Sequence, residues 1–458
     1  MGYRRRVRHR AFLLTVVTAS LGALLLAPAA DAATPPVGPA PKVPTAARPA
    51  SVATASAVVA RMARLIPARV TAAKALRGSH TALVLDPATG LTIWSTGAGT
   101  PMRGASTTKL ATAVTSLAVL GTGTRFPTRV VTGRNDHEVV LVAGGDPMLT
   151  SGQLSSLATA TAKALAAKVP AAPAVPPSTP TGLRIAVTVD DTLYGPATLA
   201  SGWPADYTPV VVSPVRPLVR DLRHSSDTSA DAARYFTARL SVALAAALKA
   251  RTDLAPYTRY TGRLAAPAGA TELARFRGNT SGAALAHMLV VSDNDTAERL
   301  FRDNAVAQGK PGTWVGAAGA EMATLTRLGA DVRGFSIHDG SGVSRNDRVT
   351  ARGLVSLLRL AISSDHPELA PLRGYLPVAG VSGTLASRYR SKPTRCAAGR
   401  VFAKTGTLHD AIGLAGYARG SDGRLRLFAV LDVPRAGYTQ GATRAAVDLV
   451  PTTMTGCY

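Results

Sequence analysis

The sequence predicts a mixed α/β (α+β) protein in which an inserted, mainly β domain interrupts a scaffold of helices and β-type runs. β-type runs lie near both ends of the chain, at 81–95 and 401–433, with helical patterns beside each. The stretch 127–270 differs, because short β-type runs and a proline-rich segment dominate it. With 458 residues, 46% of them hydrophobic, the chain is long enough for about two or three packed domains.

The first 32 residues have the order of a secretory signal. Five arginines between Arg4 and Arg10 precede an apolar run at 11–27, and Ala30-Asp31-Ala32 offers small residues around a cut. We therefore predict export to the cell envelope or beyond, with residues 33–50, rich in Ala, Pro and Thr, as a linker. The alternative is an uncleaved anchor that leaves the protein membrane-associated, because the length of the run is borderline for a span.

The first part of the main domain is predicted to cover residues 51–126. A helix is predicted over 51–64, and β-type runs at 81–86 and 91–95 flank Pro87-Ala88-Thr89-Gly90 as a hairpin. A longer helix is predicted over 106–120, followed by a glycine. Its core-facing positions recur at helical spacing: Leu110, Ala113, Val114, Leu117 and Leu120.

The inserted domain is predicted to span 127–270. Its β-type runs lie at 129–132, 139–143 and 184–190. A proline-rich loop at 170–180 interrupts them, and one amphipathic helix is expected near 230–250.

The main domain is predicted to resume over 271–458. Its helices are expected at 281–291, 313–328 and 350–363. Strands follow at 401–404, 412–419 and 424–433, with a turn at 421–423, and a helix near 442–449 closes the chain.

The chain is strongly basic, with a formal charge of +25, and removal of a signal with five arginines and one aspartate leaves +21. Such an excess suits a nucleic-acid binder, but an exported protein rarely meets nucleic acid, so we expect no such partner. Loose attraction to an anionic membrane surface or to acidic wall polymers needs no dedicated site. A merely solubilising surface explains the charge equally well.

Two cysteines are present, Cys396 and Cys457. In an oxidising compartment they can pair, which closes a loop of 61 positions and ties down the C-terminal end. Two cysteines cannot form a four-ligand structural zinc site, and no His-rich cluster accompanies them, so we expect no metal.

Ser106-Thr107-Thr108-Lys109 places a hydroxyl and an amine one helical turn apart. A serine hydroxyl becomes a nucleophile when a base takes its proton, and Lys109 is the candidate base. At the start of a helix, backbone N–H groups favour developing negative charge. Taken alone, the motif equally describes an N-capping serine beside a solvated lysine.

Two further motifs follow in the chain. Ser292-Asp293-Asn294 comes after a helical segment, and its hydroxyl and amide suit a proton relay and a donor to a carbonyl. Lys404-Thr405-Gly406-Thr407 ends a β-type run, where Gly406 lets substrate backbone approach and the lysine and threonines suit a carboxylate. Ordinary turns and edge strands contain such residues too.

Together the motifs form the set S-x-x-K, S-D-N and K-T-G of penicillin-binding proteins and class A β-lactamases. The chain resembles the class C low-molecular-mass penicillin-binding proteins, which are D-alanyl-D-alanine carboxypeptidases and endopeptidases. Other stretches share the resemblance: Ala-Gly-Gly-Asp-Pro at 143–147, Asp-Asp-Thr-Leu-Tyr-Gly-Pro at 190–196, His-Asp-Gly-Ser-Gly-Val-Ser-Arg at 338–345 and the run at 376–385. It implies a penicillin-binding/β-lactamase-like transpeptidase domain, an antiparallel sheet with flanking helices, with the insert between the first two motifs.

The resemblance also implies roles. Ser106 attacks the carbonyl between two D-alanines, and Lys109, its pKa lowered by burial and by the charge of Lys404, takes the proton. Backbone N–H groups of Ser106 and Thr407 form the oxyanion hole. Ser292 passes a proton to the leaving amine, and Asn294 orients the substrate amide.

The terminal carboxylate of the substrate is assigned to Lys404, Thr405 and Thr407, beside Gly406. Asp339 and Ser341 are expected to line the site and contact substrate, although the composition of their loop is equally that of a tight turn. The implied partners are peptidoglycan stem peptides, with β-lactam antibiotics as covalent inhibitors, and no cofactor is expected.

Three alternatives stay open. A β-lactamase is the nearest, but the chain lacks the Glu-x-x-Leu-Asn segment of class A enzymes, so its acyl-enzyme should persist. A D-amino-acid esterase or aminopeptidase on the same scaffold is the second. The third is a non-catalytic cell-wall-binding protein that acts through its basic surface. The motifs do not separate a carboxypeptidase from an endopeptidase.

Overall fold

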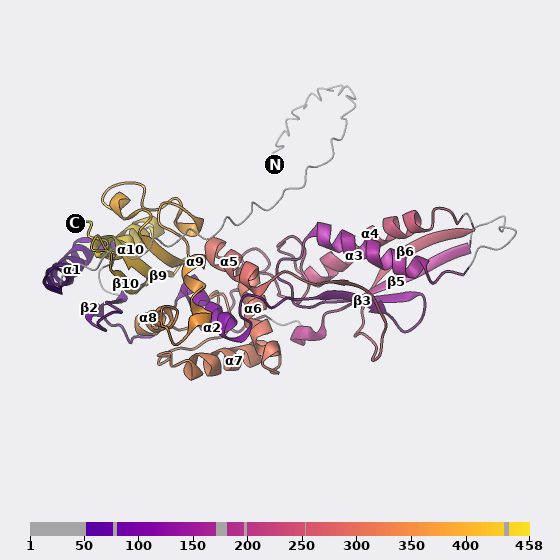
Figure 1. The fold of residues 1–458 in the computed structure, drawn as a ribbon, viewed down its shortest axis with the longest axis horizontal. Coiled ribbons are helices and arrows are strands. Elements are labelled where there is room, and N and C mark those ends of the chain that lie inside the picture. The colour runs from indigo at the N-terminus through magenta and orange to yellow at the C-terminus, as the bar shows by residue number, and fades with distance from the viewer. Residues whose placement is uncertain (1–51, 77–79, 171–180, 197–198, 252, 435–438) are drawn as a thin grey trace, which may run out of the picture. The chain divides into compact units, whose positions relative to one another are not determined.

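The fold is shown by a computed structural model that describes residues 52–76, 80–170, 181–196, 199–251, 253–434 and 439–458 (Figure 1). The predicted signal at 1–32, the linker at 33–50 and nearly all of the proline-rich loop at 170–180 lie outside the described residues. All described residues belong to one compact unit. Within them, no helix is both long enough and apolar enough to cross a membrane.

The first sheet is antiparallel and joins strands from both ends of the chain, in the order β2–β1–β10–β9–β8. These are β1 (Thr81–Leu85), β2 (Thr92–Thr96), β8 (Val401–Leu408), β9 (Ala411–Arg419) and β10 (Leu425–Asp432). Helices α1 (Val52–Ala72) and α10 (Gln440–Met454) share a core with one face of this sheet. The predicted antiparallel sheet with flanking helices is therefore present.

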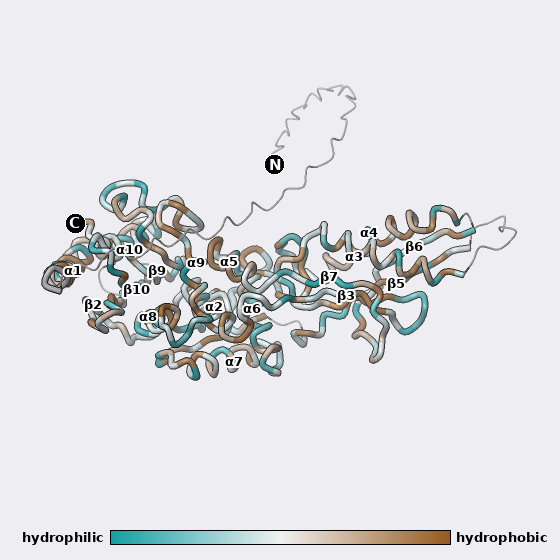
Figure 2. The backbone as a smooth tube through the Cα atoms, viewed as in Figure 1, coloured by the Kyte–Doolittle hydropathy of each residue, from teal (hydrophilic) through white to brown (hydrophobic). Residues whose placement is uncertain are grey.

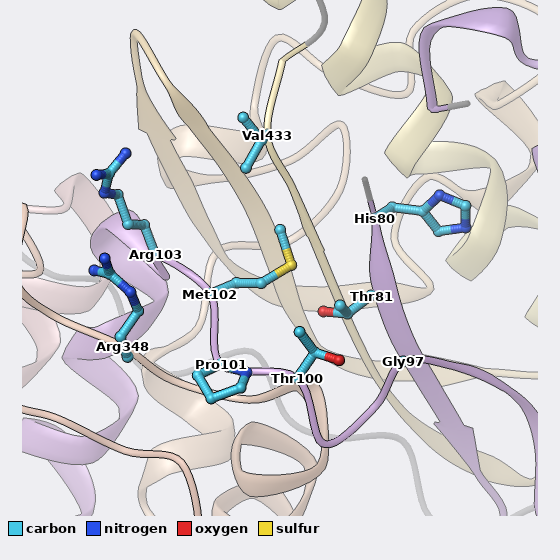
Figure 3. A pocket seen from close by; sticks show the side chains of 9 residues that line it. All are labelled: His80, Thr81, Gly97, Thr100, Pro101, Met102, Arg103, Arg348 and Val433. Carbon is cyan, nitrogen blue, oxygen red and sulfur yellow. The ribbon is translucent and has the colours of Figure 1, made fainter. Parts of the chain in front are cut away.

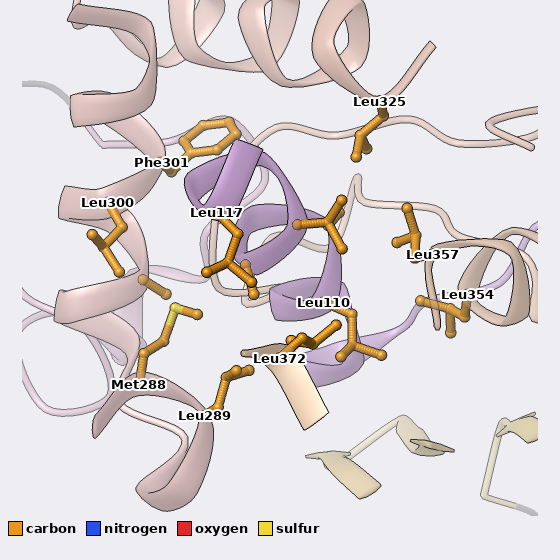
Figure 4. Packing of buried hydrophobic residues seen from close by; sticks show 14 of the residues in the cluster. Leu110, Leu117, Met288, Leu289, Leu300, Phe301, Leu325, Leu354, Leu357 and Leu372 are labelled. Atoms are coloured by element: carbon orange, nitrogen blue, oxygen red, sulfur yellow. The ribbon is translucent and has the colours of Figure 1, made fainter. Parts of the chain in front are cut away.

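A group of helices packs on the other face of the first sheet. These are α2 (Lys109–Val119), α5 (Ser281–Val291), α6 (Asn294–Ala307), α7 (Trp314–Arg327), α8 (Ala351–Leu360) and α9 (Leu372–Tyr375). Figure 4 shows Leu110 and Leu117 of α2 among leucines of the neighbouring helices. All five positions predicted to face the core from this helix are buried, so that prediction is confirmed. Because α2 is buried on every side, its first turn is held firmly in place.

The second sheet has the strand order β6–β5–β4–β3–β7. Its strands are β3 (Thr128–Thr132), β4 (Glu138–Val142), β5 (Thr181–Asp190), β6 (Leu254–Arg263) and β7 (Glu272–Phe276). Helices α3 (Ser151–Ala166) and α4 (Thr228–Ala247) pack on one face of it, and both alternate between hydrophobic and hydrophilic stretches (Figure 2). The sheet continues past residue 270, and the domain limits read from the sequence stay a prediction.

The segment that carries the second sheet was expected to be mainly β with one helix, and the structure makes it mixed. Helix α3 was missed because its core side is built partly of alanine and threonine, which weaken the apolar pattern. A capping box at its start, formed by Thr150 and Gln153, was the available signal. The edge strands β6 and β7 were missed as well, since each has only one buried residue and the rest are exposed or partly exposed.

Two further helices differ from the sequence prediction. Helix α1 continues past residue 64 to Ala72 with Pro67 inside it. Helix α6 was not predicted, because its sequence is polar, although nearly all of it is buried. Arg299 and Arg302 can be buried there because backbone carbonyl oxygens accept hydrogen bonds from their guanidinium groups. Arg299 donates to the carbonyl oxygens of Arg216 and Asp295. Arg302 donates to the carbonyl oxygens of Gly312, Val215 and Tyr194.

Cys396 and Cys457 form a disulfide, as the sequence suggested. The bond closes a loop of 61 positions, which in the chain-entropy description stabilises the fold by about 4 kcal/mol. Changing both cysteines to serine should lower the free energy of unfolding by that order, measured by urea unfolding without reductant. Reductant should destabilise the unchanged protein and leave the double variant as it was, and equal stability of the two proteins would contradict the prediction.

Candidate active site

Ser106 lies in a short 3-10 helix, η2 (Ala105–Thr108), that leads directly into α2. Ala105 has φ of 44°, a left-handed conformation that costs a residue with a side chain roughly 1–3 kcal/mol. Gly342 packs against this turn so closely that a Cβ there would lie 2.0 Å from the carbonyl oxygen of Ala105. The turn keeps Ser106 partly exposed and buries the three residues that follow it.

Lys109 is fully buried beneath Ser106. Its Nζ donates to Ser106 Oγ at 2.9 Å, to Asn294 Oδ1 at 2.7 Å and to the carbonyl oxygen of Ser341 at 3.0 Å. Burial lowers the pKa of Lys109 to about 8, although the negative charges of Glu298, Asp339 and Asp293 act to raise it. An amine with a pKa near 8 is neutral in part of the molecules at neutral pH and can then accept a proton.

The Ser292-Asp293-Asn294 motif forms the tight link between α5 and α6. Ser292 ends α5 with φ of 66°, and Asp293 caps α6 by accepting the backbone N–H of Thr296 at 2.6 Å. Asn294 therefore begins α6 with its side chain beside Lys109, and its Nδ2 donates to the carbonyl oxygen of Val211 at 2.8 Å. The local chain path thus directs both a hydroxyl and an amide toward the two lysines.

Lys404 is the second fully buried lysine, and it lies on β8. Its Nζ donates to Ser292 Oγ at 2.8 Å and to the carbonyl oxygen of Thr405 at 2.9 Å. Burial, and then the positive charge of Lys109, lower the pKa of Lys404 well below its ordinary value. From the sequence, the charge of Lys404 was expected to lower the pKa of Lys109, whereas the repulsion acts on the pKa of Lys404, and burial is what lowers the pKa of Lys109. Each serine hydroxyl is bonded to one lysine.

Gly406 lets β8 approach the Ser106 turn. A Cβ at this position would lie 2.6 Å from the carbonyl oxygen of Gly104 and 3.3 Å from the backbone nitrogen of Ser106. Beside it, Thr405 Oγ1 donates to Thr384 Oγ1 at 2.8 Å, while Thr407 stays partly exposed. The structure therefore brings all three predicted motifs into one place.

The free edge of β8 begins at the site. Residues 401–403 are covered, since the backbone N–H of Ala403 donates to Pro377 and that of Ala379 donates to Val401. From Lys404 onward, no strand of the described chain pairs with this edge. An open edge offers backbone N–H and C=O groups to an extended peptide.

The predicted substrate contacts of Asp339 and Ser341 need correction. Both side chains are fully buried. Asp339 accepts the backbone N–H groups of Ser341, Gly342 and Ser344 and the indole N–H of Trp203, at 2.7–3.1 Å. The loop lies behind Lys109 and supports its ammonium group through the Ser341 carbonyl, so it does not face a substrate.

Sequence reasoning also missed Glu298, which is fully buried in α6. Its two carboxylate oxygens accept the backbone N–H groups of Gly340 and Ser341 at 2.8 and 2.9 Å. The available signal was its position four residues after Asn294, which places both side chains on one helical face.

A pocket of about 510 Å³ lies beside the Ser106 turn and contains none of the three motifs. Figure 3 shows Arg103 and Arg348 together on one side of it, pointing away from Thr81 and Thr100. Arg103 instead donates to Asp410 in the β8–β9 turn at 2.7 Å. In the ranges that the structure describes, no three His, Cys, Asp or Glu side chains are arranged to hold a metal ion.

Comparisons with known proteins agree with this geometry. The model of the D-Ala-D-Ala carboxypeptidase 3 (S13) family matches residues 65–225 and 222–452. Carboxypeptidase DacB of Mycolicibacterium smegmatis is 32% identical over 390 residues, which are 83% of this chain and 81% of that protein.

Two solved structures of penicillin binding protein 4 from Haemophilus influenzae share the fold at 19% identity. One has a TM-score of 0.67 and covers 86% of this chain and 97% of its own. The other, complexed with a β-lactam, has a TM-score of 0.59 and covers 85% and 98%. The predicted fold class and family resemblance are thereby confirmed. Because the family model matches most of the chain, the chain belongs to the D-Ala-D-Ala carboxypeptidase 3 (S13) family of serine-type hydrolases.

Proposed function

We propose that this carboxypeptidase removes the terminal D-alanine of peptidoglycan stem peptides through an acyl-enzyme on Ser106. The observation that carries the proposal is the 2.9 Å contact between Ser106 Oγ and the Nζ of a buried lysine with a pKa of about 8. A hydroxyl beside a partly neutral amine can give up its proton as it attacks. A bond forms between Oγ and the carbonyl carbon, and the proton moves to Lys109 Nζ.

The leaving amine needs a proton when its bond to the carbonyl carbon breaks. Ser292 Oγ, bonded to Lys404 Nζ at 2.8 Å, is the proposed relay. Asn294 holds Lys109 through Oδ1 and Val211 through one N–H, which leaves its second N–H for the substrate amide. Water then attacks the ester, so the products are a shortened peptide, free D-alanine and the restored serine.

The free edge of β8 is the proposed position of the substrate backbone. Backbone N–H groups of Ser106 and Thr407 are assigned to the oxyanion, which is supported by the close approach of Gly406 to the Ser106 turn. Lys404, Thr405 and Thr407 are assigned to the terminal carboxylate. A bound carboxylate favours the ammonium form of Lys404, so substrate binding should raise the pKa of Lys404 and the fraction of molecules in which it is protonated.

Relatives support the substrate and the inhibitor class. The family and the Mycolicibacterium protein are named as carboxypeptidases, and the Haemophilus protein has been solved with a β-lactam. We extend both properties to this chain, with Ser106 as the acylated residue. We also include endopeptidase activity on cross-linked peptides in this proposal, since that reaction uses the same acyl transfer.

We also propose that the enzyme works in the cell envelope, after export through the predicted signal at 1–32. The net charge of +25, which becomes +21 once the signal is removed, favours loose association with anionic membrane surfaces or acidic wall polymers. This attraction is long-range and weakens as salt is added.

Labelling with fluorescent penicillin tests the proposed function. We expect a persistent label, located on Ser106 by mass spectrometry of the digested protein, and release of one alanine from a pentapeptide ending in D-Ala-D-Ala. The products formed from a cross-linked peptide dimer show how much endopeptidase activity accompanies the carboxypeptidase activity. Ser106→Ala should abolish both reactions, while Ser156→Ala, at an exposed serine of α3, should not. Rapid turnover of penicillin would indicate a β-lactamase, and an unlabelled protein would indicate a non-catalytic binder.

A further inference from the structure

The second sheet has a face along β5 and β6 that α3 and α4 do not cover. Ile185 and Val187 of β5 belong to the core under the helices, and Thr258 of β6 donates to the carbonyl oxygen of Thr237 in α4 at 2.9 Å. Because side chains alternate along a strand, the neighbours Arg184 and Arg259 point to the opposite face, and both are exposed.

A groove of about 550 Å³ runs over this face. Its floor is made of small residues, Gly182, Ala186 and Ala255, and its walls are made of long side chains. In the parallel pairing, Arg184 lies opposite Tyr257 and Ala186 lies opposite Arg259. Gly182 also lies opposite Ala255, so a row of small residues stands beside a row of long ones and leaves a depression in this face.

The charge in this groove is not neutralised. Arg184 and Arg259 make no ion pair within the described chain, and no carboxylate lines the groove. Other arginines of the same segment do pair with aspartates: Arg216, Arg220, Arg251 and Arg263. Two guanidinium groups on one narrow surface thus keep their capacity to bind carboxylates in a bidentate manner.

An exposed aromatic residue, Tyr257, lies opposite Arg184 and two positions before Arg259 on the same strand. Tyr257 is 54% exposed, which makes it one of the largest exposed apolar surfaces of the described chain. Aromatic rings with a polar tip are favoured where a partner brings both apolar and polar groups. The combination suits an extended polymer that carries acid groups at intervals.

We infer that this groove, formed by Arg184, Tyr257 and Arg259 over β5 and β6, binds a strand of peptidoglycan through carboxylates of its stem peptides. The inference rests on the proposed function, since the peptides processed at Ser106 end in a carboxylate. Charge complementarity and the recessed form of the groove favour an extended carboxylate-bearing chain over the flat surface of a membrane. Binding at a second place on the polymer raises the effective concentration of stem peptides at the catalytic site.

Co-sedimentation with insoluble peptidoglycan tests the groove. The peptidoglycan is stripped of phosphate polymers by acid, and the protein carries Ser106→Ala so that it does not consume the ligand. We expect the triple variant R184A/Y257A/R259A to lose retention by about tenfold or more, the equivalent of ~1.4 kcal/mol. The control R239A/R327A removes the same charge from two exposed arginines elsewhere and should be retained almost as well as the parent.

A second measurement separates the groove from the catalytic centre. With Ser106 intact, the triple variant should release D-alanine from a free pentapeptide at the parent rate and from intact peptidoglycan more slowly. If the parent protein itself fails on the pentapeptide, the proposed function is wrong, whatever the binding result. R184Q/R259Q, which keeps a polar side chain at both positions and removes only the two charges, replaces the triple variant if thermal unfolding shows that the latter has not folded.

Three outcomes would overturn the inference. One is equal retention of the triple variant and the R239A/R327A control, which would make the binding a general charge effect. Another is retention only before the phosphate polymers are removed. The third is loss of binding to anionic vesicles or to single-stranded DNA in the triple variant, with binding to peptidoglycan unchanged.

Discussion

Replacing Lys109 with methionine is expected to slow acylation of Ser106 by penicillin by roughly 10⁴-fold or more, the range seen when a base is removed from a nucleophile–base pair. Methionine keeps the length and apolar stem of the buried side chain, so the core around α2 stays filled. What disappears is the amine 2.9 Å from Ser106 Oγ, and with it the acceptor of the hydroxyl proton. Stopped-flow labelling with fluorescent penicillin gives the rate.

A matched control shows whether the effect is local. Lys310→Met makes the same chemical change at an exposed lysine and should acylate at the parent rate. If Lys109→Met were acylated as fast as Lys310→Met, a different group would have to take the proton from Ser106. A thermal unfolding measurement on both variants excludes loss of the fold as the cause.

Replacing Glu298 with glutamine should lower the pH at which acylation reaches half its maximum. Acylation needs the neutral amine of Lys109, so its rate rises as the pH passes upward through the pKa of that group, about 8. The negative charge of Glu298 raises this pKa, as do those of Asp339 and Asp293. Removing one negative charge therefore lowers the pKa of Lys109 and moves the profile to lower pH.

The expected shift depends on Glu298 being a carboxylate in the folded protein. Burial raises the pKa of Glu298. Both of its oxygens nevertheless accept backbone N–H groups, from Gly340 and Ser341, and these hydrogen bonds act to lower that pKa because they stabilise the ionised form. With Lys109 close by, the charged form is the one that the contacts favour.

Glutamine also replaces one of the two acceptor oxygens with an NH2 group, so one backbone N–H of the 340–341 loop loses its acceptor. An unsatisfied buried donor costs about 1–3 kcal/mol, so the variant should be less stable as well. The pH profile distinguishes the two effects, because a purely structural residue would change stability and leave the midpoint where it was.

Glu321→Gln is the control for this experiment, since Glu321 is equally buried on α7 and does not bond to the 340–341 loop. The control should keep the midpoint of the parent, and a midpoint shared by parent and Glu298→Gln would contradict the assignment.

The sequence allowed the motifs to be found because each depends on local spacing. Ser106 and Lys109 are one helical turn apart, and Lys404 precedes a glycine whose missing Cβ is required for contact with the Ser106 turn. The buried position of Leu110 and its helical repeats followed from apolar periodicity in the same way.

Residues whose role depends on distant partners were not predictable. Glu298 and Arg302 look like surface charges in the sequence, because the backbone groups that satisfy them come from loops far away in the chain. The same limit explains the error at Asp339, where a composition typical of a turn gave no sign that the side chain points inward to bind its own loop.

The pairing of β1 with β10 determines how late in synthesis the first sheet can be completed. Thr81 lies opposite Leu431, so the sheet that supports the Ser106 turn stays incomplete until almost the entire polypeptide is available. Contacts so distant in sequence form slowly, whereas the second sheet closes over a much shorter stretch and can assemble earlier. A nascent chain is therefore expected to be inert, with hydrolysis beginning only after the last strands have docked.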